Sequence, residues 1–158
     1  MSHHRILFVC RGNTCRSPMA AGVLRARAAA LGRTSEFEIA SAGIAVSPAS
    51  ISADPRAIAA TARRGIDIRD HRCRPFSAAD FTGPGLILGV DHAVYAALTT
   101  RAPTNTTARI AYAMDFAADT PIGTEIPDPW CGGPADYERA LDQITRAVDG
   151  ILSVPRRA

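Results

Sequence analysis

The segment Cys10–Ser17 carries a cysteine and an arginine separated by five residues, in the order Cys-Arg-Gly-Asn-Thr-Cys-Arg-Ser. It follows an apolar run, Ile6–Val9, and precedes a helix-like stretch, Pro18–Leu31. At a strand-to-helix junction, the backbone N–H groups of the loop converge on one point, where the helix dipole adds positive potential. That field favours a thiolate at Cys10, and the planar guanidinium of Arg16 can hold two phosphate oxygens. The spacing therefore predicts phosphoryl transfer to sulfur.

Short apolar segments alternate with longer helix-like segments around this loop. Strands are expected at Arg5–Val9, Glu36–Ala40, Leu86–Val90 and Arg109–Met114, and helices at Pro18–Leu31, Pro55–Arg64, Asp91–Leu98 and Pro134–Leu152. A stretch rich in proline and glycine, Asp115–Gly133, is expected to be a long loop. This alternation predicts an α/β fold with a parallel sheet covered on both faces and ligand sites beyond the C-terminal strand ends. The loop that begins at Cys10 follows the first strand and lies where such a fold binds its ligand.

The size and composition of the chain fit one soluble globular domain, which we assign to residues 1–158. Hydrophobic residues make up 47%, and the formal net charge of +3 is too small to indicate nucleic acid or a membrane as a partner. No apolar stretch is long enough to cross a bilayer, and no signal peptide is evident. The four cysteines show neither a disulfide framework nor zinc-site spacing. We therefore expect a cytoplasmic protein without a metal or other cofactor.

Three sequence motifs resemble those of the low-molecular-weight protein tyrosine phosphatase family. They are Ile-Leu-Phe-Val-Cys-x-Gly-Asn-x-Cys-Arg-Ser-Pro-Met-Ala near the start, Ser41-Ala42-Gly43, and Asp-Pro-Trp at residues 128–130. The resemblance covers nearly the whole chain. It implies a three-layer α/β/α fold with a four-stranded parallel sheet of order 2-1-3-4 and a phosphate-binding loop after the first strand. It also implies a monomer or weak dimer that hydrolyses phosphotyrosine in a protein substrate through a phosphocysteine intermediate.

The resemblance also implies a role for each residue of the reaction. Cys10 is the expected nucleophile, and Arg16 is expected to bind the phosphate and stabilise the phosphoryl group during transfer. Ser17 is expected to hydrogen-bond the thiolate and ease its departure in the second step. Asp128 is the expected general acid, and then the base that activates water. Because Asp128 is far from Cys10 in sequence, the long loop must deliver it to the strand ends.

A second set of residues is expected to support the loop and the substrate. By resemblance, Asn13 and Ser41 form a hydrogen-bond net, with Asn13 in a strained backbone conformation that asparagine tolerates. His71 is expected in that net as a structural histidine, and Gly12 is expected to allow a tight turn. Trp130 is expected to form a wall of the substrate cleft. Three further residues have simpler interpretations: an N-cap for Asp91, and incidental positions for Cys73 and Cys131.

The chain departs from the family pattern at two positions of the phosphate-binding loop. Thr14 stands where the tyrosine-specific members usually have an apolar residue, and in this it resembles the bacterial phosphoarginine phosphatases. Arg11 adds positive charge at the cleft rim and favours acidic peptide flanks. The expected cleft wall Ile44–Ser52 has no aromatic residue, which leaves Trp130 as the expected stacking partner of a substrate ring. Phosphotyrosine is therefore the first expected substrate, and phosphoarginine is the alternative.

Arsenate reduction and phosphopeptide binding without catalysis are two alternatives to this function, and the role of Cys15 is a separate open question. Arsenate reductases share the loop but need a relay of cysteines, and no second cysteine follows closely behind Cys73. A phosphopeptide-binding module without activity would not need Asp128 in addition to Cys10. Cys15 either packs in the core or traps an oxidised Cys10 as a reversible disulfide, and the sequence leaves both open.

Overall fold

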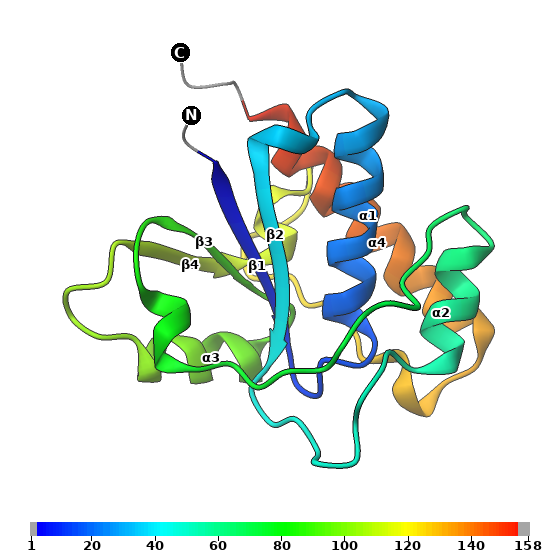
Figure 1. Cartoon of the computed structure of the whole chain (residues 1–158), viewed down its shortest axis with the longest axis horizontal. Helices are drawn as coiled ribbons and strands as arrows, with labels where there is room; N and C mark the ends of the chain where they lie inside the picture. Colours follow the sequence, from blue (N-terminus) through cyan, green and yellow to red (C-terminus); the bar gives the residue numbers. More distant parts are fainter. Residues whose placement is uncertain (1–2, 155–158) are drawn as a thin grey trace.

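A computed structural model describes residues 3–154 of the protein (Figure 1). The parallel sheet has the order β2-β1-β3-β4, which confirms the predicted α/β class and strand order. The strands are β1 (His4–Cys10), β2 (Phe37–Gly43), β3 (Gly85–Gly89) and β4 (Ala108–Tyr112), and the helices are α1 (Arg16–Ala30), α2 (Pro55–Ala62), α3 (His92–Arg101) and α4 (Pro134–Ser153). Short 3₁₀ helices lie at Thr34–Glu36, Ala78–Phe81, Ala113–Phe116 and Pro129–Cys131.

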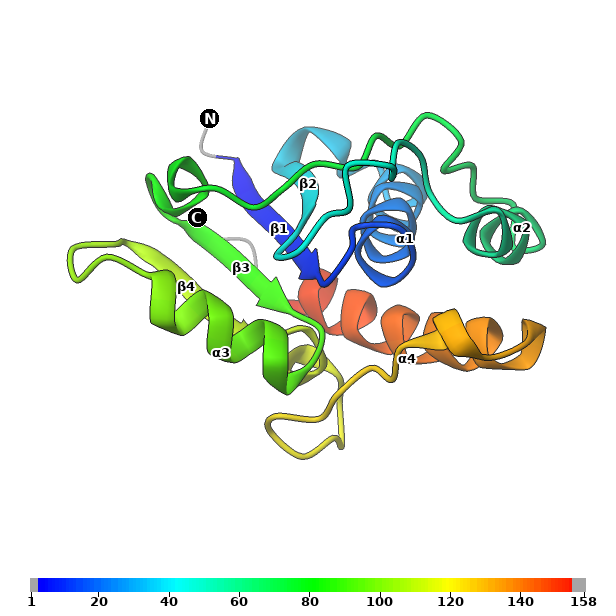
Figure 2. The same cartoon turned by 90° about the horizontal axis from the view of Figure 1, so that it is seen from below.

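The helices form a layer on each face of the sheet. α1 packs against β1 and β2 and also against α4, while α3 packs against β3 and β4. Figure 2 shows α3 on one side of the sheet and α1 and α4 on the other. Right-handed crossovers explain this arrangement, because the connection from β1 to β2 and that from β3 to β4 run in opposite directions along the sheet. α2 packs outside the sheet, against α1 and α4.

The neighbouring strands β1 and β3 form the switch point at which the chain turns to opposite faces of the sheet. Beyond their C-terminal ends, a crevice opens that typically binds the ligand in such folds. Residues 11–15 connect β1 to α1, and Asp91 directly precedes α3. Both connections therefore meet at the same edge of the sheet.

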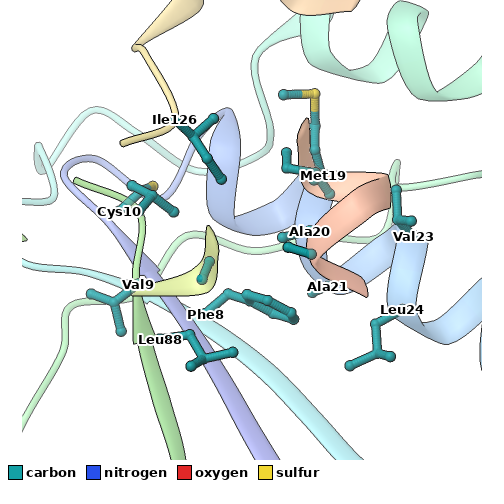
Figure 3. Close-up of a cluster of buried hydrophobic side chains, with 14 of the residues drawn as sticks. Phe8, Val9, Cys10, Met19, Ala20, Ala21, Val23, Leu24, Leu88 and Ile126 are labelled. Carbon is teal, nitrogen blue, oxygen red and sulfur yellow. The ribbon is translucent and has the colours of Figure 1, made fainter. Parts of the chain in front are cut away.

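The hydrophobic core fixes the position of β1 and α1 beneath this edge. Every residue of β1 from Ile6 to Cys10 is buried, as expected for a central parallel strand that is covered on both faces. Figure 3 shows Phe8 among Leu88 of β3 and the small side chains Ala20 and Ala21 of α1. Small residues let α1 approach the sheet closely, so the start of α1 is held directly beyond the end of β1.

Several element boundaries differ from those predicted. β2 extends three residues beyond Ala40 to Gly43, and α1 begins at Arg16, two residues before the predicted Pro18. Pro18 fits in the first helical turn because its missing N–H has no intrahelical acceptor there. The predicted fourth strand ends at Tyr112, since a 3₁₀ helix takes Ala113–Phe116. Among residues 3–154, no helix is long and apolar enough to span a membrane.

Candidate active site

Cys10 is the last residue of β1 and is buried at the start of the phosphate-binding loop, which comprises residues 10–17. Its Sγ atom accepts a hydrogen bond from the Asn13 N–H at 3.2 Å and lies 2.9 Å from Ser17 Oγ. A thiolate can only accept hydrogen bonds, so in that state the Ser17 O–H donates to it. Cys15 is the N-cap of α1, and its side chain makes no hydrogen bond to the N–H groups of the first helical turn. Backbone N–H groups at a helix start are a typical binding site for an anion.

Asn13 is fully buried and has a φ of 57°, in the left-handed region. Its Nδ2 group donates to Ser17 Oγ at 2.8 Å and to Ser41 Oγ at 3.0 Å. Its Oδ1 atom accepts the backbone N–H of Arg74 at 2.9 Å, and this contact fixes the orientation of the amide. Three hydrogen bonds of the side chain therefore hold a backbone conformation that would otherwise be strained.

Residues 71–74 lie behind the loop and bind the backbone of Asn13. The Asn13 carbonyl accepts hydrogen bonds from His71 Nε2 at 2.8 Å and from Cys73 Sγ at 3.1 Å. Because a carbonyl can only accept, His71 carries a proton on Nε2. Burial lowers the pKa of His71, which favours the neutral ring at neutral pH. His71 thus supports the loop as predicted for a structural histidine, and Cys73, whose position was expected to be incidental, supports it as well.

Arg16 is the first residue of α1, and only 3% of it is exposed. Its NH1 group donates to Asp91 Oδ2 and to the Ile126 carbonyl, both at 2.8 Å. Asp91 Oδ1 accepts the Val94 N–H at 2.8 Å, which confirms the predicted N-cap of α3. Asp91 therefore has a second contact that its sequence position as an N-cap does not predict: it orients the guanidinium of Arg16. The available signal was an acidic residue directly after the third predicted strand, at the edge where Arg16 lies.

Asp128 lies in the segment Ile126–Trp130, which we call the acid loop. The side chain of Asp128 is 49% exposed, and its Oδ2 atom lies 3.6 Å from Arg16 NH2. Its Oδ1 atom accepts the Trp130 N–H at 3.1 Å and so caps the 3₁₀ helix Pro129–Cys131. Ile126 is buried and donates its N–H to the Val90 carbonyl at 2.8 Å. The long loop thus brings Asp128 to the phosphate-binding loop.

A cleft of about 430 Å³ lies between the phosphate-binding loop and the acid loop. Its lining contains most of the predicted site residues and part of the segment after β2: Cys10, Arg11, Gly12, Thr14, Cys15, Arg16, Ala45, Ser47, Ser50, Asp128 and Trp130. Trp130 is 59% exposed and borders the cleft. A larger hollow of about 690 Å³, next to Ser41 and His71, contains neither Cys10 nor Asp128 in its lining. Cys10, Arg16 and Asp128 therefore meet in the smaller cleft and not in the larger hollow.

Gly43, at the end of β2, lets the backbone of the phosphate-binding loop pack directly against β2. A Cβ atom there would lie 2.7 Å from the Arg11 carbonyl oxygen and 2.9 Å from the Asn13 nitrogen. The left-handed conformation of this loop belongs to Asn13 and not to Gly12. A Cβ atom at Gly12 would meet only Thr14 Oγ1, at an ordinary 3.8 Å.

The remaining cysteines differ in their surroundings. Cys15 is buried with its Sγ atom 3.4 Å from the Tyr137 hydroxyl, and burial raises the pKa of its thiol. Cys131 is exposed, and all four cysteines are free. No group of three or more His, Cys, Asp or Glu side chains in the described part of the chain is arranged to hold a metal ion.

The comparison with known families decides the class of the protein. Residues 5–157 match the sequence profile of the family described as "Low molecular weight phosphotyrosine protein phosphatase". The chain belongs to this family. A low molecular weight protein-tyrosine-phosphatase of Streptomyces coelicolor is 34% identical over 155 residues, which are 97% of this chain and 94% of that relative. This phosphatase is therefore a hydrolase of the tyrosine phosphatase class, and the resemblance read from its motifs is confirmed.

Solved structures share the fold of this phosphatase. A protein tyrosine phosphatase from Entamoeba histolytica, with Hepes in its active site, has a TM-score of 0.87 at 29% identity, covering 94% of each chain. The arginine phosphatase YwlE of Bacillus subtilis has a TM-score of 0.83 at 24% identity, covering 97% of this chain and 98% of the other. The second likeness shows the fold alone. Because tyrosine and arginine phosphatases share this fold, the fold itself does not select the substrate.

Proposed function

We propose that this phosphatase hydrolyses phosphotyrosine in proteins through a phosphocysteine intermediate on Cys10. One observation carries the proposal: Cys10, Arg16 and Asp128 line the same cleft, which Trp130 borders. A nucleophile, a phosphate-binding cation and a proton donor thus face one bound phosphoryl group. Trp130 offers an aromatic surface on which a substrate phenyl ring can stack.

In the first step, the Cys10 thiolate attacks phosphorus and forms an S–P bond while the P–O bond to tyrosine breaks. The Asp128 carboxyl donates its proton to the leaving oxygen, so that tyrosine departs as a neutral phenol. Arg16 and the N–H groups at the start of α1 stabilise the charge on the equatorial oxygens of the phosphoryl group. The contacts of Arg16 NH1 with Asp91 and Ile126 set the direction of the guanidinium before substrate binds.

In the second step, the Asp128 carboxylate takes a proton from water, and the resulting hydroxide equivalent attacks phosphorus. The S–P bond breaks, inorganic phosphate leaves, and the sulfur returns to a thiolate. Ser17 stabilises that leaving group, since its Oγ atom lies 2.9 Å from Cys10 Sγ. Asn13 Nδ2 donates to the same hydroxyl oxygen at 2.8 Å, so the Ser17 proton points to another acceptor. The nearer of the two available acceptors is sulfur, since the Ala42 carbonyl lies 3.4 Å away.

Asp128→Ala tests the general acid. We expect kcat/KM with phenyl phosphate, whose leaving group needs a proton, to fall about 10²- to 10³-fold, because kcat/KM reports the first step and not the hydrolysis that both substrates share. With 4-nitrophenyl phosphate, an activated ester, we expect a much smaller loss. The exposed Asp149→Ala on α4 is the control and is expected to retain both activities. Equal losses of kcat/KM on the two substrates would show that Asp128 is not the acid.

Phosphoarginine is the second candidate substrate, and it is favoured by Thr14, which lines the cleft. A hydroxyl at this position gives the cleft a polar group that can orient a guanidinium or a water. The proposed function is tested directly by kcat/KM for a phosphotyrosine peptide and a phosphoarginine peptide of the same sequence, without metal and with reductant. A higher value for phosphotyrosine supports the first proposal, and the reverse order supports the second.

Thr14→Ile is expected to shift this ratio of kcat/KM values towards phosphotyrosine by about tenfold, because an apolar group replaces a hydrogen-bonding one. The variant is measured with the same two peptides. Arg11→Ala at the cleft rim is the control, since it also changes a cleft residue of the loop but removes charge instead of a hydroxyl. An unchanged ratio in Thr14→Ile would make this residue part of the packing only.

A further inference from the structure

Arg56 is the second residue of α2, and its guanidinium reaches three other parts of the chain. Its NH1 group donates to the carbonyl oxygen of Trp130 at 2.9 Å. Its Nε and NH2 groups donate to the two carboxylate oxygens of Asp54, at 3.1 Å and 3.0 Å. The same guanidinium lies over the ring of Tyr137, 5.2 Å from its centroid. One side chain therefore contacts the acid loop, the N-cap of α2 and a side chain of α4.

Two of these three partners also contact the phosphate-binding loop. The Asp54 N–H donates to the Thr14 carbonyl at 2.9 Å. The buried Tyr137 has its hydroxyl 3.4 Å from Cys15 Sγ. Arg56 thus links the backbone of the acid loop, at Trp130, to the side of the phosphate-binding loop that holds Thr14 and Cys15.

The acid loop has a different anchor at its other end. Ile126 is buried, donates its N–H to Val90, and accepts a hydrogen bond from Arg16 on its carbonyl. Asp128 lies midway between Ile126 and Trp130, and its own side chain is half exposed. The position of its carboxyl group over the cleft therefore depends on the backbone at both ends, and Arg56 holds the Trp130 end.

We propose that Arg56 is a positioning residue that holds the acid loop so that Asp128 can protonate the leaving group. The inference rests on the proposed function, because it requires Asp128 to be the general acid. Loss of the Arg56 contact frees the Trp130 end, and a displacement of about 1 Å at a proton donor is enough to lower the rate substantially. Phosphate binding in the loop is expected to persist, because Cys10, Arg16 and Asn13 keep their own contacts.

The chain contains a matched control for this role in Arg69. Arg69 makes the same three hydrogen bonds to Asp67, two positions before it, as Arg56 makes to Asp54: from its N–H, its Nε and its NH2. No hydrogen bond of the Arg69 guanidinium within residues 3–154 reaches the acid loop. Arg69→Ala therefore removes the same charge and the same local motif without separating the two loops.

The experiment compares Arg56→Ala and Arg69→Ala in the full chain. For Arg56→Ala, we expect kcat/KM with phenyl phosphate to fall about 10- to 100-fold more than kcat/KM with 4-nitrophenyl phosphate. The inhibition constant for inorganic phosphate is expected to stay within about twofold of the wild-type value, which would show that the phosphate-binding loop is intact. Arg69→Ala is expected to leave all three values unchanged. In the double variant Arg56→Ala/Asp128→Ala, we expect no selective loss beyond that of Asp128→Ala, because the acid is already absent.

Arg56→Met tests the hydrogen bonds of Arg56 while keeping its packing, and it replaces Arg56→Ala in the experiment if that variant fails to fold. Methionine keeps an unbranched stem against Tyr137 but donates no hydrogen bond, so the same selective loss is expected. Equal losses on both substrates, or wild-type values on both substrates in Arg56→Met, would overturn the positioning role while Asp128→Ala remains selective. If Asp128→Ala itself shows no dependence on the leaving group, the proposed general acid fails, and the role of Arg56 fails with it.

Discussion

Cys10→Ser is expected to abolish turnover, with a loss in kcat of at least about 10⁴-fold, while phosphate still binds. The serine oxygen would occupy nearly the same position and keep the donors Asn13 N–H and Ser17 O–H. A hydroxyl is a far weaker nucleophile at neutral pH than a thiolate, and no general base lies in hydrogen-bond contact with Cys10 in the described residues to activate it. Binding depends instead on Arg16 and the loop N–H groups, which the substitution leaves in place.

The loss is measured as kcat with 4-nitrophenyl phosphate, and binding as calorimetric titration with inorganic phosphate. Cys131→Ser is the matched control, because Cys131 is an exposed free cysteine outside the cleft lining. That variant is expected to keep its turnover. If Cys10→Ser retains kcat within about tenfold of the wild type, a different group forms the covalent intermediate and the mechanism is wrong.

The parts of the fold that were predictable are those with strong local patterns. β1 is a continuous apolar run, and α4 carries its buried residues at helical spacing, so both were located to within one or two residues. The end of β2 was missed because Ser41, Ala42 and Gly43 are small and have weak strand preference. They form a strand because they pair with Phe8, Val9 and Cys10 of β1, which no local pattern reveals.

The candidate site divides in the same way between local and distant contacts. Cys10, Arg16 and Ser17 lie within one strand-loop-helix unit, so their spacing was enough to propose them. Asp91 contacts this unit directly, and Arg56 is linked to it through Asp54 and Tyr137. Their local sequence explains them only as the N-cap of α3 and a residue of the first turn of α2. Their further contacts exist because parallel strand ends meet at one edge of the sheet, a consequence of the fold and not of the local sequence.

Arg16→Lys is expected to lower kcat about 10³-fold or more, although the charge is conserved. The NH1 group of Arg16 is committed to Asp91 and Ile126, and the rest of the planar group faces the cleft next to Asp128. A lysine has one ammonium group, which cannot satisfy these acceptors and hold two phosphate oxygens at the same time. Because the site is buried, we expect that ammonium to stay with the Asp91 carboxylate.

The variant is measured by kcat with 4-nitrophenyl phosphate and by the inhibition constant for inorganic phosphate. Both are expected to worsen, and kcat more strongly, because charge on the transferring phosphoryl group is stabilised most in the transition state. Arg11→Lys makes the same substitution on the same loop at an exposed position, and a change of less than about tenfold in kcat is expected there, since no buried contact is lost. Equal and small effects of the two substitutions would mean that positive charge alone is required at position 16. A large effect confined to Arg16→Lys would mean that catalysis depends on the planar guanidinium. One of its nitrogens binds Asp91, at the end of the neighbouring strand, while the others remain for the phosphate.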